Sequence, residues 1–487
     1  MDTIGSERFK ILDYAFYPDS IAVVGASEHP LSFGYHFLRH LIEHKFKGAI
    51  YPVNPQNEII QGLKSYPSML EIPGNVDFVI CCVATDKVLQ LLDECALKQV
   101  KIVHLLTARF SETGRKEAIE LERQVLAKAQ EYGIRLIGPN CMGIYSPESG
   151  IAFGYNMPGI KGNIGVIFQS GGAATLLIQN GAVAGLRFSK AVSYGNALDV
   201  NECELLHYFA DDDSTSIVAA YFEGTKNGKS FFDALKTVAD RKPVIVIKGG
   251  KGNAGSRAAS SHTAAIAGEQ DIWKIAFKQS GAIEVDDIDE MLNLLMLFYE
   301  LPPVYCNRAA IMGGGGGKAV IAADLAEAAG IILPPLPFDI KNKLKAIVPG
   351  LWDWLSNPLD TSIWGDEGIK LAEVPRLFLE SPDYDFLIIQ SSEDNPMADD
   401  IWAYIMKMNT TMILNNFDRR GKPIIAIMPR VKSYENPMDK FRWKIIEEEK
   451  AKLINAGVPV FDSISEAVKA LSRYINYWRR HQTNIHA

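Results

Sequence analysis

The sequence predicts an α/β protein in which three units of alternating strands and helices follow one another along the chain. Short apolar runs recur between longer helical patterns, and such runs are typical of strands buried on both faces of a parallel sheet. Glycine-rich turns follow several of these runs. With 487 residues and 47% hydrophobic content, the chain is long enough for several domains with large cores. Strands that alternate with helices form doubly wound parallel sheets, so we expect this architecture.

Residues 1–150 form the first predicted unit, and the turn after its first strand is a candidate phosphate site. The turn runs from Gly25 to Gly34 and opens a helix, whose N-terminal N–H groups favour anions. It is a poor dinucleotide fingerprint, because Ser27 replaces the second glycine and Asn54 ends the second strand where NAD proteins place a carboxylate. This disfavours a dehydrogenase; coenzyme A, with its phosphorylated ribose, fits better, and an empty crevice is the alternative. The strands of this unit are predicted at residues 20–25, 48–53, 76–82, 101–106 and 134–138.

Residues 151–302 repeat the pattern, with polar or glycine-rich turns where the strands end. Ser170, Gly171 and Gly172 precede an apolar helical stretch, so their N–H groups and the helix dipole could hold a phosphoryl group. Glu223 follows the third strand and is a second candidate. The strands are predicted at residues 163–168, 188–193, 216–222 and 244–248.

The segment 249–268 carries a single histidine, His262, among glycines, hydroxyls and other small residues. Small side chains allow close approach of a ligand, and an imidazole with an ordinary pKa of ~6.5 can act as a nucleophile near neutral pH. The segment links a strand to a helical pattern that begins near Ile272, and such loops hold the sites of α/β sheets. We therefore predict a phosphorylatable histidine, the alternative being that His262 is a helix-start residue and the glycines form an ordinary loop. Glu223 could fix the imidazole tautomer, or it could simply be solvated.

Residues 303–487 form the third predicted unit, after a boundary at Pro302 and Pro303. Gly313 to Gly317 with Lys318 resembles a P-loop only superficially, because Ala319 stands where that motif requires Ser or Thr. We predict a tight strand-to-helix turn near a partner or a phosphate, with a flexible linker as the alternative. The strands are predicted at residues 308–312, 384–390, 423–428 and 458–461.

Charge and cysteine content narrow the functional class. A net charge of -8 disfavours a nucleic-acid surface, and the six cysteines lack the CxxC spacing of a zinc site, so we expect no metal. The polar N-terminus does not resemble a signal peptide, and no apolar stretch reaches the ~20 residues of a membrane helix. A cytoplasmic location is the expectation.

Taken in order, the motifs resemble the alpha subunit of the ADP-forming (NDP-forming) acyl-CoA synthetases, relatives of succinyl-CoA synthetase, along nearly the whole chain. The most specific part runs from Ser256 through His262 to Glu290. The other matching motifs are residues 24–27, 51–55, 110–114, 138–143, 169–172, 195–196 and 357–360.

This resemblance implies an α/β chain with a Rossmann-like CoA-binding domain followed by two flavodoxin-like domains. It implies that His262 becomes phosphorylated, that Glu223 contacts it, and that Ser170, Gly171 and Gly172 hold the phosphoryl group. The implied reaction converts acyl-CoA, ADP and phosphate reversibly to the acid, CoA and ATP through an acyl phosphate. The positions implied to line the CoA cleft are Gly25, Ser27, Asn54, Pro55, Val83, Ala84, Thr107, Asn140 and Cys141.

The resemblance also implies a partner, because the family binds its magnesium nucleotide in an ATP-grasp domain that these 487 residues lack. A separate beta subunit in an α2β2 heterotetramer is therefore expected. The alternative of another class is a non-catalytic CoA-binding regulatory module, which the retained His262 disfavours.

The chain departs from the family pattern at several positions. Arg109 replaces a glycine that is common in the family, and its side chain could obstruct the CoA cleft or change its charge. Ala264 replaces another glycine. Gln56 lies near the position where relatives have a CoA-contacting lysine, and Lys318 alters a glycine-proline turn of the family. The acid substrate stays open. Four aromatic residues would suit a bulky acid if they line the pocket and otherwise pack in the core: Phe153, Tyr155, Tyr194 and Trp364.

Overall fold

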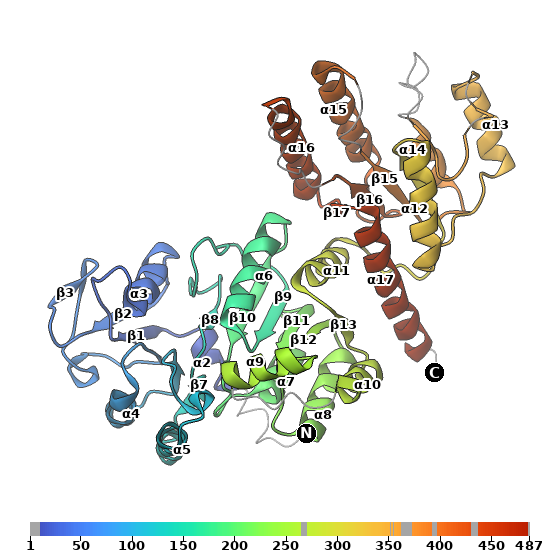
Figure 1. Ribbon diagram of the computed structural model, residues 1–487. Helices are drawn as coiled ribbons and strands as arrows, with labels where there is room; N and C mark the ends of the chain where they lie inside the picture. Colours follow the sequence, from blue (N-terminus) through green and yellow to red (C-terminus); the bar gives the residue numbers. More distant parts are fainter. Residues whose placement is uncertain are drawn as a thin grey trace. The chain divides into compact units, whose positions relative to one another are not determined.

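The protein forms two compact units, Met1–Leu292 and Asn293–Ala487, each of which is described by itself (Figure 1). The computed structural model describes residues 10–263, 270–350, 352–353, 355–361, 373–391, 397–429 and 437–485, with side chains for all of these except residues 259–263, 437–440 and 483–485. Within this described part, no helix is long and apolar enough to cross a membrane. The first unit contains two large sheets and the second contains one.

The first sheet has five parallel strands in the order β2-β1-β5-β6-β7. Its elements are α2 (Asp13–Phe16), β1 (Ser20–Val24), α3 (Phe33–Glu43), β2 (Ala49–Val53), the hairpin β3 (Ile59–Ile60) and β4 (Leu63–Lys64), η1 (Met69–Glu71), β5 (Phe78–Cys81), η2 (Thr85–Lys87), α4 (Val88–Leu97), β6 (Ile102–Leu105), η3 (Ser111–Thr113), α5 (Lys116–Glu131) and β7 (Arg135–Ile137). Because crossovers are right-handed, α3 covers one face and α4 and α5 cover the other (Figure 1). The direction of the crossovers reverses between β1 and β5, which is where such sheets bind ligands.

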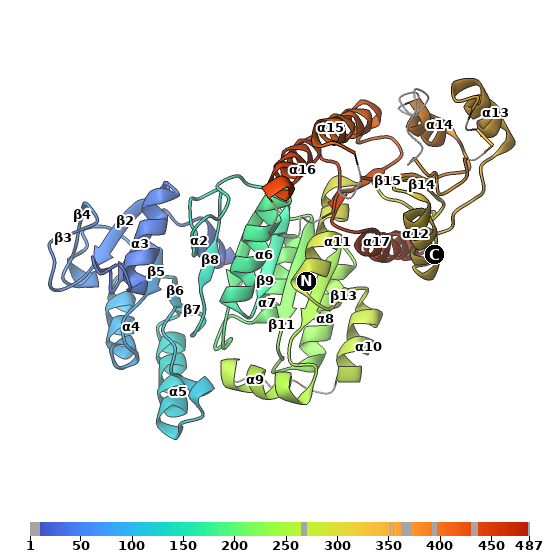
Figure 2. The same ribbon diagram turned by 45° about the horizontal axis from the view of Figure 1, so that its top comes forward.

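The second sheet has the order β13-β12-β11-β9-β10-β8 and is parallel except for β8, which pairs antiparallel with β10. Its elements are β8 (Gly143–Tyr145), β9 (Ile164–Phe168), α6 (Gly171–Val183), β10 (Phe188–Ser193), α7 (Glu202–Asp211), β11 (Ile217–Phe222), α8 (Gly228–Ala239), β12 (Val244–Lys248), α9 (Asn253–Thr263), α10 (Gln270–Ser280) and β13 (Ile283–Val285), and α11 (Ile288–Glu300) follows. The crossovers reverse direction between β9 and β11. By right-handedness, α6 therefore lies on the face opposite α7 and α8 (Figure 2).

The third sheet is parallel, with the order β14-β15-β16-β17. Its elements are β14 (Ala309–Gly313), α12 (Gly316–Ala328), α13 (Phe338–Ile347), α14 (Val374–Glu380), β15 (Phe386–Gln390), α15 (Asp399–Asn416), β16 (Ile424–Ile427), α16 (Pro437–Ala456), β17 (Val460–Phe461) and α17 (Ile464–Ile485). Helices α12 and α17 pack against each other and against the sheet, and α15 packs against α16. The core of this unit surrounds the buried Tyr384 and Trp402.

The predicted α/β architecture is confirmed, and local chemistry explains where several elements start. Every apolar run predicted as a strand is one, and the residues of β1, β5, β6, β9, β12, β14 and β15 are buried throughout. Ser32, Asn201 and Asn227 begin their helices by accepting backbone N–H groups of the first turn, which would otherwise lack partners. The short strands β8 and β13 were not predicted.

Residues 195–201 join the two sheets of the first unit by pairing with the segment after β7. The backbone N–H groups of Asn196, Leu198 and Val200 donate to the carbonyl oxygens of Pro139, Gly138 and Leu136. The three N···O distances are 3.0, 2.9 and 3.1 Å, respectively. Gly195 has a φ of +54°, and a Cβ there would overlap the carbonyl groups of residues 139 and 140. Only glycine suits this close approach, so the Gly195-Asn196 motif fixes the first sheet against the second.

The guanidinium of Arg135 reinforces this junction. It donates to both carboxylate oxygens of Asp199 at 2.8 and 3.1 Å, and to both of Glu204 at 2.7 and 2.8 Å. All three side chains are largely buried. Bidentate pairs of this kind fix orientation as well as distance.

Candidate functional site

The carboxyl ends of β9 and β11 form the first part of the candidate site, at the point where the crossovers of the second sheet reverse. Ser170 caps α6, because its Oγ accepts the N–H of Ala173 at 3.5 Å. Gly171 begins the helix, and Gly172 is exposed with open space above it. The predicted helix N-terminus is thus present, and its first turn is accessible to an anion.

Gly171 is needed because the first sheet approaches α6 closely at this point. A Cβ on Gly171 would overlap Cγ of Met142 and lie 3.2 Å from Oγ of Ser193. The N–H of Met142 in turn donates to Oγ of Ser193 at 3.2 Å. The start of α6 therefore lies directly against the chain that leaves the first sheet.

Glu223 follows β11 and is 3% exposed. Its backbone N–H donates to Oε1 of Gln169 at 2.8 Å, and its Oε1 accepts the hydroxyl of Tyr221 at 3.2 Å. Burial, followed by the charge of Glu223, raises the pKa of Tyr221, so the phenol stays a donor. The carboxylate predicted from sequence is therefore beside the start of α6, held by two residues of its own sheet.

Lys248 and Lys251 belong to the site but were not among the residues predicted from sequence. Lys248 ends β12, is 4% exposed, and donates to the carbonyl oxygen of Glu223 at 2.7 Å. Burial lowers its pKa to about 8. Lys251 pairs with Glu284 at 2.9 Å and Asp286 at 2.8 Å, and these partners outweigh burial and raise its pKa. A charged residue at the end of a buried apolar strand was the available sequence signal for Lys248.

The backbone of His262 lies in α9, where the sequence had predicted a loop. The three alanines and Arg257 between residues 253 and 263 favour a helix more than the glycines around them suggest. Helix α9 packs against η3 in the first of the two sheet regions, and η3 also contacts α5. The side chain of His262, like all of Ala264, lies outside the described residues. The segment that carries His262 therefore spans from the second sheet to the first.

The predicted CoA-cleft residues gather at the carboxyl edge of the first sheet. Gly25 has a φ of +88°, and a Cβ there would lie 3.0 Å from the carbonyl carbon of Cys82. The side chain of Ser27 accepts the N–H of His29 at 2.9 Å. The amide of Asn54 donates to the carbonyl of Ala26 at 2.8 Å, so it supports the turn after β1. Pro55 and Ala84 are exposed at the same edge.

The far side of this edge is built from the ends of β5, β6 and β7. Thr107 donates its hydroxyl to the carbonyl of Val83 at 2.6 Å. Asn140, with a φ of +60°, donates its N–H to the carbonyl of Thr107 at 3.1 Å. Cys141 is 5% exposed, and burial raises the pKa of its thiol. This thiol is therefore protonated at neutral pH.

Asn196 connects the two candidate sites. Its side chain accepts the amide of Asn140 at 3.4 Å and donates to Glu112 at 2.8 Å. Glu112 lies in η3, the element against which α9 packs. The CoA-cleft residues, the start of α6 and the histidine helix are thus linked within one unit.

The departures from the family pattern have structural correlates. Arg109 has a φ of +81°, which explains why glycine is common there, and its side chain is exposed. Gln56 is exposed at the end of β2, and the side chain of Lys318 packs over Gly314.

The aromatic candidates for an acyl pocket differ in their exposure to solvent. Phe153 and Tyr194 are fully buried packing residues, whereas Tyr155 is 44% exposed and its hydroxyl lies 2.7 Å from Nδ1 of His36. Trp364 lies outside the described residues.

Comparisons with known proteins agree with this geometry. A family model described as the CoA binding domain matches residues 19–147, and one described as the succinyl-CoA ligase like flavodoxin domain matches residues 161–298. The ADP-forming acetate–CoA ligase II subunit alpha of Pyrococcus furiosus is 39% identical over 380 residues, which are 78% of this chain and 82% of that protein. The ADP-forming acetate–CoA ligase II of Archaeoglobus fulgidus is 32% identical over 470 residues, 96% of this chain and 67% of that protein. The solved dinucleotide-forming acetyl-coenzyme A synthetase 1 of Ca. Korarchaeum cryptofilum, in complex with phosphate and ADP, matches with a TM-score of 0.81 and 30% identity, covering 98% of this chain and 99% of that chain.

Proposed function

The chain belongs to the family of ADP-forming acyl-CoA synthetases, and we propose that it is the CoA-binding, phosphohistidine-carrying component of such an enzyme. The reaction converts acyl-CoA, ADP and phosphate reversibly to the free acid, CoA and ATP. One observation carries the proposal: the capped start of α6 and the buried Glu223 meet at one switch point, joined through Gln169. Ligand sites of doubly wound sheets lie at such points.

The CoA half of the reaction uses the edge of the first sheet. The CoA phosphates bind at the turn from Gly25 to Ser27, and the chain around Asn140 and Cys141 faces the thioester. A phosphate oxygen attacks the acyl carbon, the carbon–sulfur bond breaks, and the thiolate leaves as CoA, so the product is an acyl phosphate. The N–H groups of Gly171 and Gly172, with the dipole of α6, offset the negative charge of the phosphate.

His262 then takes the phosphoryl group from the acyl phosphate, and the free acid leaves. Glu223 accepts a hydrogen bond from the N–H of the other imidazole nitrogen and stabilises the ring as it becomes positively charged. The contact of α9 with η3 supports this role, because it brings the histidine helix to the CoA-binding sheet. A covalent carrier replaces one transfer over a long distance with two local transfers.

The nucleotide half requires residues beyond these 487. We propose that a beta subunit with an ATP-grasp domain binds the magnesium nucleotide, in an α2β2 assembly. The alpha-subunit names of relatives support a partner of this kind, whereas the Archaeoglobus fulgidus relative extends beyond the region that this chain matches. The magnesium ion would neutralise the transferring charge on the nucleotide.

The competing function is a CoA-binding regulatory module without catalysis. Both functions require the cleft of the first sheet, but only the enzyme requires His262, Glu223 and the start of α6. The retained His262, together with Glu223 and the start of α6 joined through Gln169, favours the enzyme.

Phosphorylation of His262 tests the proposal. The purified chain is incubated with phosphate and a panel of acyl-CoA esters, and its intact mass is measured under non-acidic conditions beside a His262→Asn control. One added phosphoryl group, absent from the control, is expected, and the esters that support it identify the acyl group. No addition, also after mixing with the candidate partner and ATP, would leave only the regulatory module.

A further inference from the structure

The ammonium group of Lys248 lies where three parts of the site meet. It donates to the carbonyl oxygen of Glu223 at 2.7 Å and to that of Gly249, and it lies 4.9 Å from the centre of the Trp273 ring. Glu223 carries the carboxylate of the site. Gly249 is the first residue of the histidine segment, and Trp273 lies in α10, just after that segment.

The two ends of the histidine segment, residues 249–272, therefore converge on one side chain. Trp273 is 7% exposed and packs against Phe231 and Phe277, so its ring is a fixed wall for the ammonium. The N–H of Gly249 donates to the carbonyl of Phe222, which pairs with Lys248 across β11 and β12. The segment that leaves the sheet at Gly249 thus returns to the same point at α10.

This arrangement is stabilising only while the lysine is present. A buried ammonium is costly unless it is hydrogen-bonded, and here two carbonyls and an aromatic face provide the compensation. Removing the ammonium leaves two carbonyl oxygens without this donor and the indole face without its cation. The backbone of Glu223 and both ends of the segment then lose their common attachment.

We propose that Lys248 is a positioning residue that holds Glu223 and both ends of the histidine segment in the arrangement needed for phosphoryl transfer. It does not contact the reacting atoms. It acts by fixing the backbone that presents the carboxylate and the backbone from which the histidine segment departs. This inference rests on the proposed function, because it assigns Lys248 a role in that reaction.

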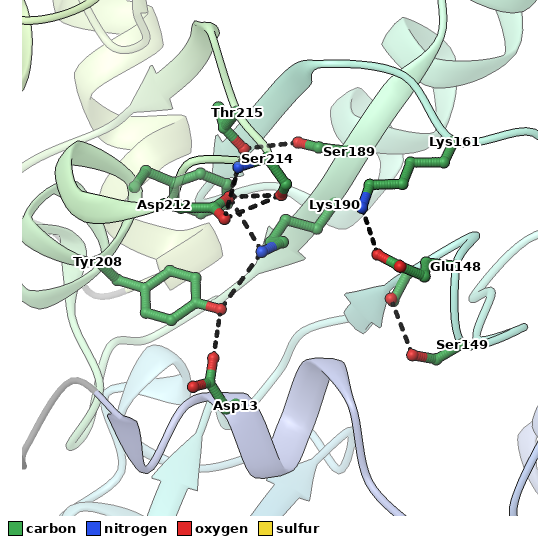
Figure 3. Close-up of polar contacts among 12 residues, drawn as sticks. Asp13, Glu148, Ser149, Lys161, Ser189, Lys190, Tyr208, Asp212, Ser214 and Thr215 are labelled. Atoms are coloured by element: carbon green, nitrogen blue, oxygen red, sulfur yellow. Dashed lines mark hydrogen bonds and ion pairs between the residues drawn. The ribbon is translucent and has the colours of Figure 1, made fainter.

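A second buried lysine of the same sheet provides a matched control. Lys190 on β10 is 1% exposed, pairs with Asp212 at 3.0 Å, and lies 4.9 to 5.3 Å from the ring centres of Phe16, Tyr17 and Tyr208. Figure 3 shows its ammonium between Asp212 and Tyr208, whose hydroxyl donates to Asp13 of α2 at 2.8 Å. Lys190 is as buried as Lys248 and also lies beside aromatic rings, but it pairs with a carboxylate and faces α2 instead of the histidine segment.

Hydrogen exchange tests the attachment without using the reaction. The full-length chain is compared as wild type, Lys248→Met, Lys248→Arg and Lys190→Met, with exchange followed in peptides from residues 249–263 and 270–280. Exchange in both peptides should accelerate in Lys248→Met, return towards wild type in Lys248→Arg, and stay unchanged in Lys190→Met. Equal protection in Lys248→Met and wild type would overturn the inference.

Kinetics test the role in the reaction. With acyl-CoA and phosphate, Lys248→Met should form phosphohistidine about 100-fold more slowly than wild type, because small displacements of reacting groups have effects of this size. The half-saturating acyl-CoA concentration should not change, since the CoA cleft is intact. Lys248→Arg should restore most of the rate, and Lys190→Met should keep it.

The outcomes separate the two claims. If the wild-type protein never becomes phosphorylated, with or without the partner and ATP, both the proposed function and the role of Lys248 in it are excluded. A phosphorylated wild type with an equally fast Lys248→Met variant leaves the function standing and overturns the inference alone. Equal slowing in Lys190→Met and Lys248→Met would also overturn it, since the loss would then reflect general destabilisation.

Discussion

The backbone N–H of Glu223 donates to the side-chain oxygen of Gln169 across 2.8 Å, and this hydrogen bond joins the ends of β11 and β9. Gln169 is immediately followed by Ser170, which caps α6. One side chain therefore fixes the distance between a carboxylate and a helix N-terminus. A histidine that acts between a carboxylate and a phosphoryl group would require the two to be held in a fixed arrangement of this kind.

Replacing Glu223 by glutamine should slow phosphorylation of His262 without unfolding the protein. The amide keeps the size of the carboxylate but lacks the charge that stabilises an imidazolium ring. Intact mass after timed incubation with acyl-CoA and phosphate measures the effect. Glu202→Gln is the matched control, because Glu202 is also buried in this unit but hydrogen-bonds Thr225. A normal rate and extent of phosphorylation in Glu223→Gln would exclude the role given to Glu223.

Alanine at Gly172 should separate stability from phosphate binding. Open space surrounds Gly172, so an added methyl group fits and should stabilise the helix by ~0.5–1 kcal/mol. The same methyl group stands where an anion would approach, so phosphorylation should slow. Gly171→Ala should instead destabilise the protein, because its Cβ overlaps Met142. Urea unfolding and phosphorylation rates measure the two effects, and a fast, stable Gly172→Ala variant would place the anion elsewhere.

Arg135→Met should weaken the junction between the two sheets of the first unit. Removing one partner from a buried ion pair leaves Asp199 and Glu204 uncompensated, at a cost of about 3–5 kcal/mol. Arg123→Met is the control, because Arg123 pairs with Glu120 on the exposed surface of α5 and its loss should have little effect. Chemical unfolding of both variants tests this, and similar midpoints would contradict it.

Glycine at position 109 should be tolerated or stabilising. Arg109 has a φ of +81°, and this backbone conformation costs a residue with a side chain about 1–2 kcal/mol in the folded state. Glycine avoids that cost but loses ~0.5–1 kcal/mol more conformational entropy on folding, which is the smaller effect. Arg115, with a φ of -78°, has no such strain for glycine to relieve, so Arg115→Gly should be less stable than Arg109→Gly. Thermal unfolding ranks the two variants, and the reverse order would show that the Arg109 side chain stabilises the fold.

Lys248 should make stability depend on pH in a defined window. Burial lowers its pKa to about 8 from its ordinary 10.5, with Glu223 and Glu284 opposing the shift and Lys251 adding to it. Between pH 8 and 10.5 the unfolded chain binds this proton more than the folded chain does. The unfolding free energy of wild type should therefore rise relative to Lys248→Met as the pH increases through this window, and fall again as the pH drops through 8. Urea unfolding of the two proteins at both ends of the window measures this. A constant difference would contradict it.

Much of the fold was predictable because parallel strands that are buried on both faces consist of continuous runs of apolar residues. The run 244–248 and the turn Ser170 to Gly172 have simple local signals, and the structure has a strand and a capped helix there. The short strand β8 has no such signal, since its position depends on pairing with β10. Helix α9 was missed because Gly255 and the glycines that precede the helix indicated a loop more strongly than its three alanines indicated a helix.

The candidate site was only partly predictable, because its residues are brought together by strand order. Glu223 was identified by its place at a strand end. Its contacts with Gln169, Tyr221 and Lys248 come from neighbouring strands or from its own strand, and no spacing in the sequence reveals them. The roles of His262 and the CoA-cleft residues stay predictions.

The pairing of residues 195–201 with the segment after β7 sets where relatives of this protein can be recombined. A chimera that exchanges the first 150 residues alone would join a foreign residue 135 to the native Asp199 and Glu204, and a foreign backbone to Gly195. Residues 195–201 follow β10 of the second sheet in sequence but pair with the first sheet, and Glu204 of α7 binds Arg135 of β7. A crossover placed after α7 would transfer both halves of this interface together and keep the proposed CoA cleft with its own scaffold.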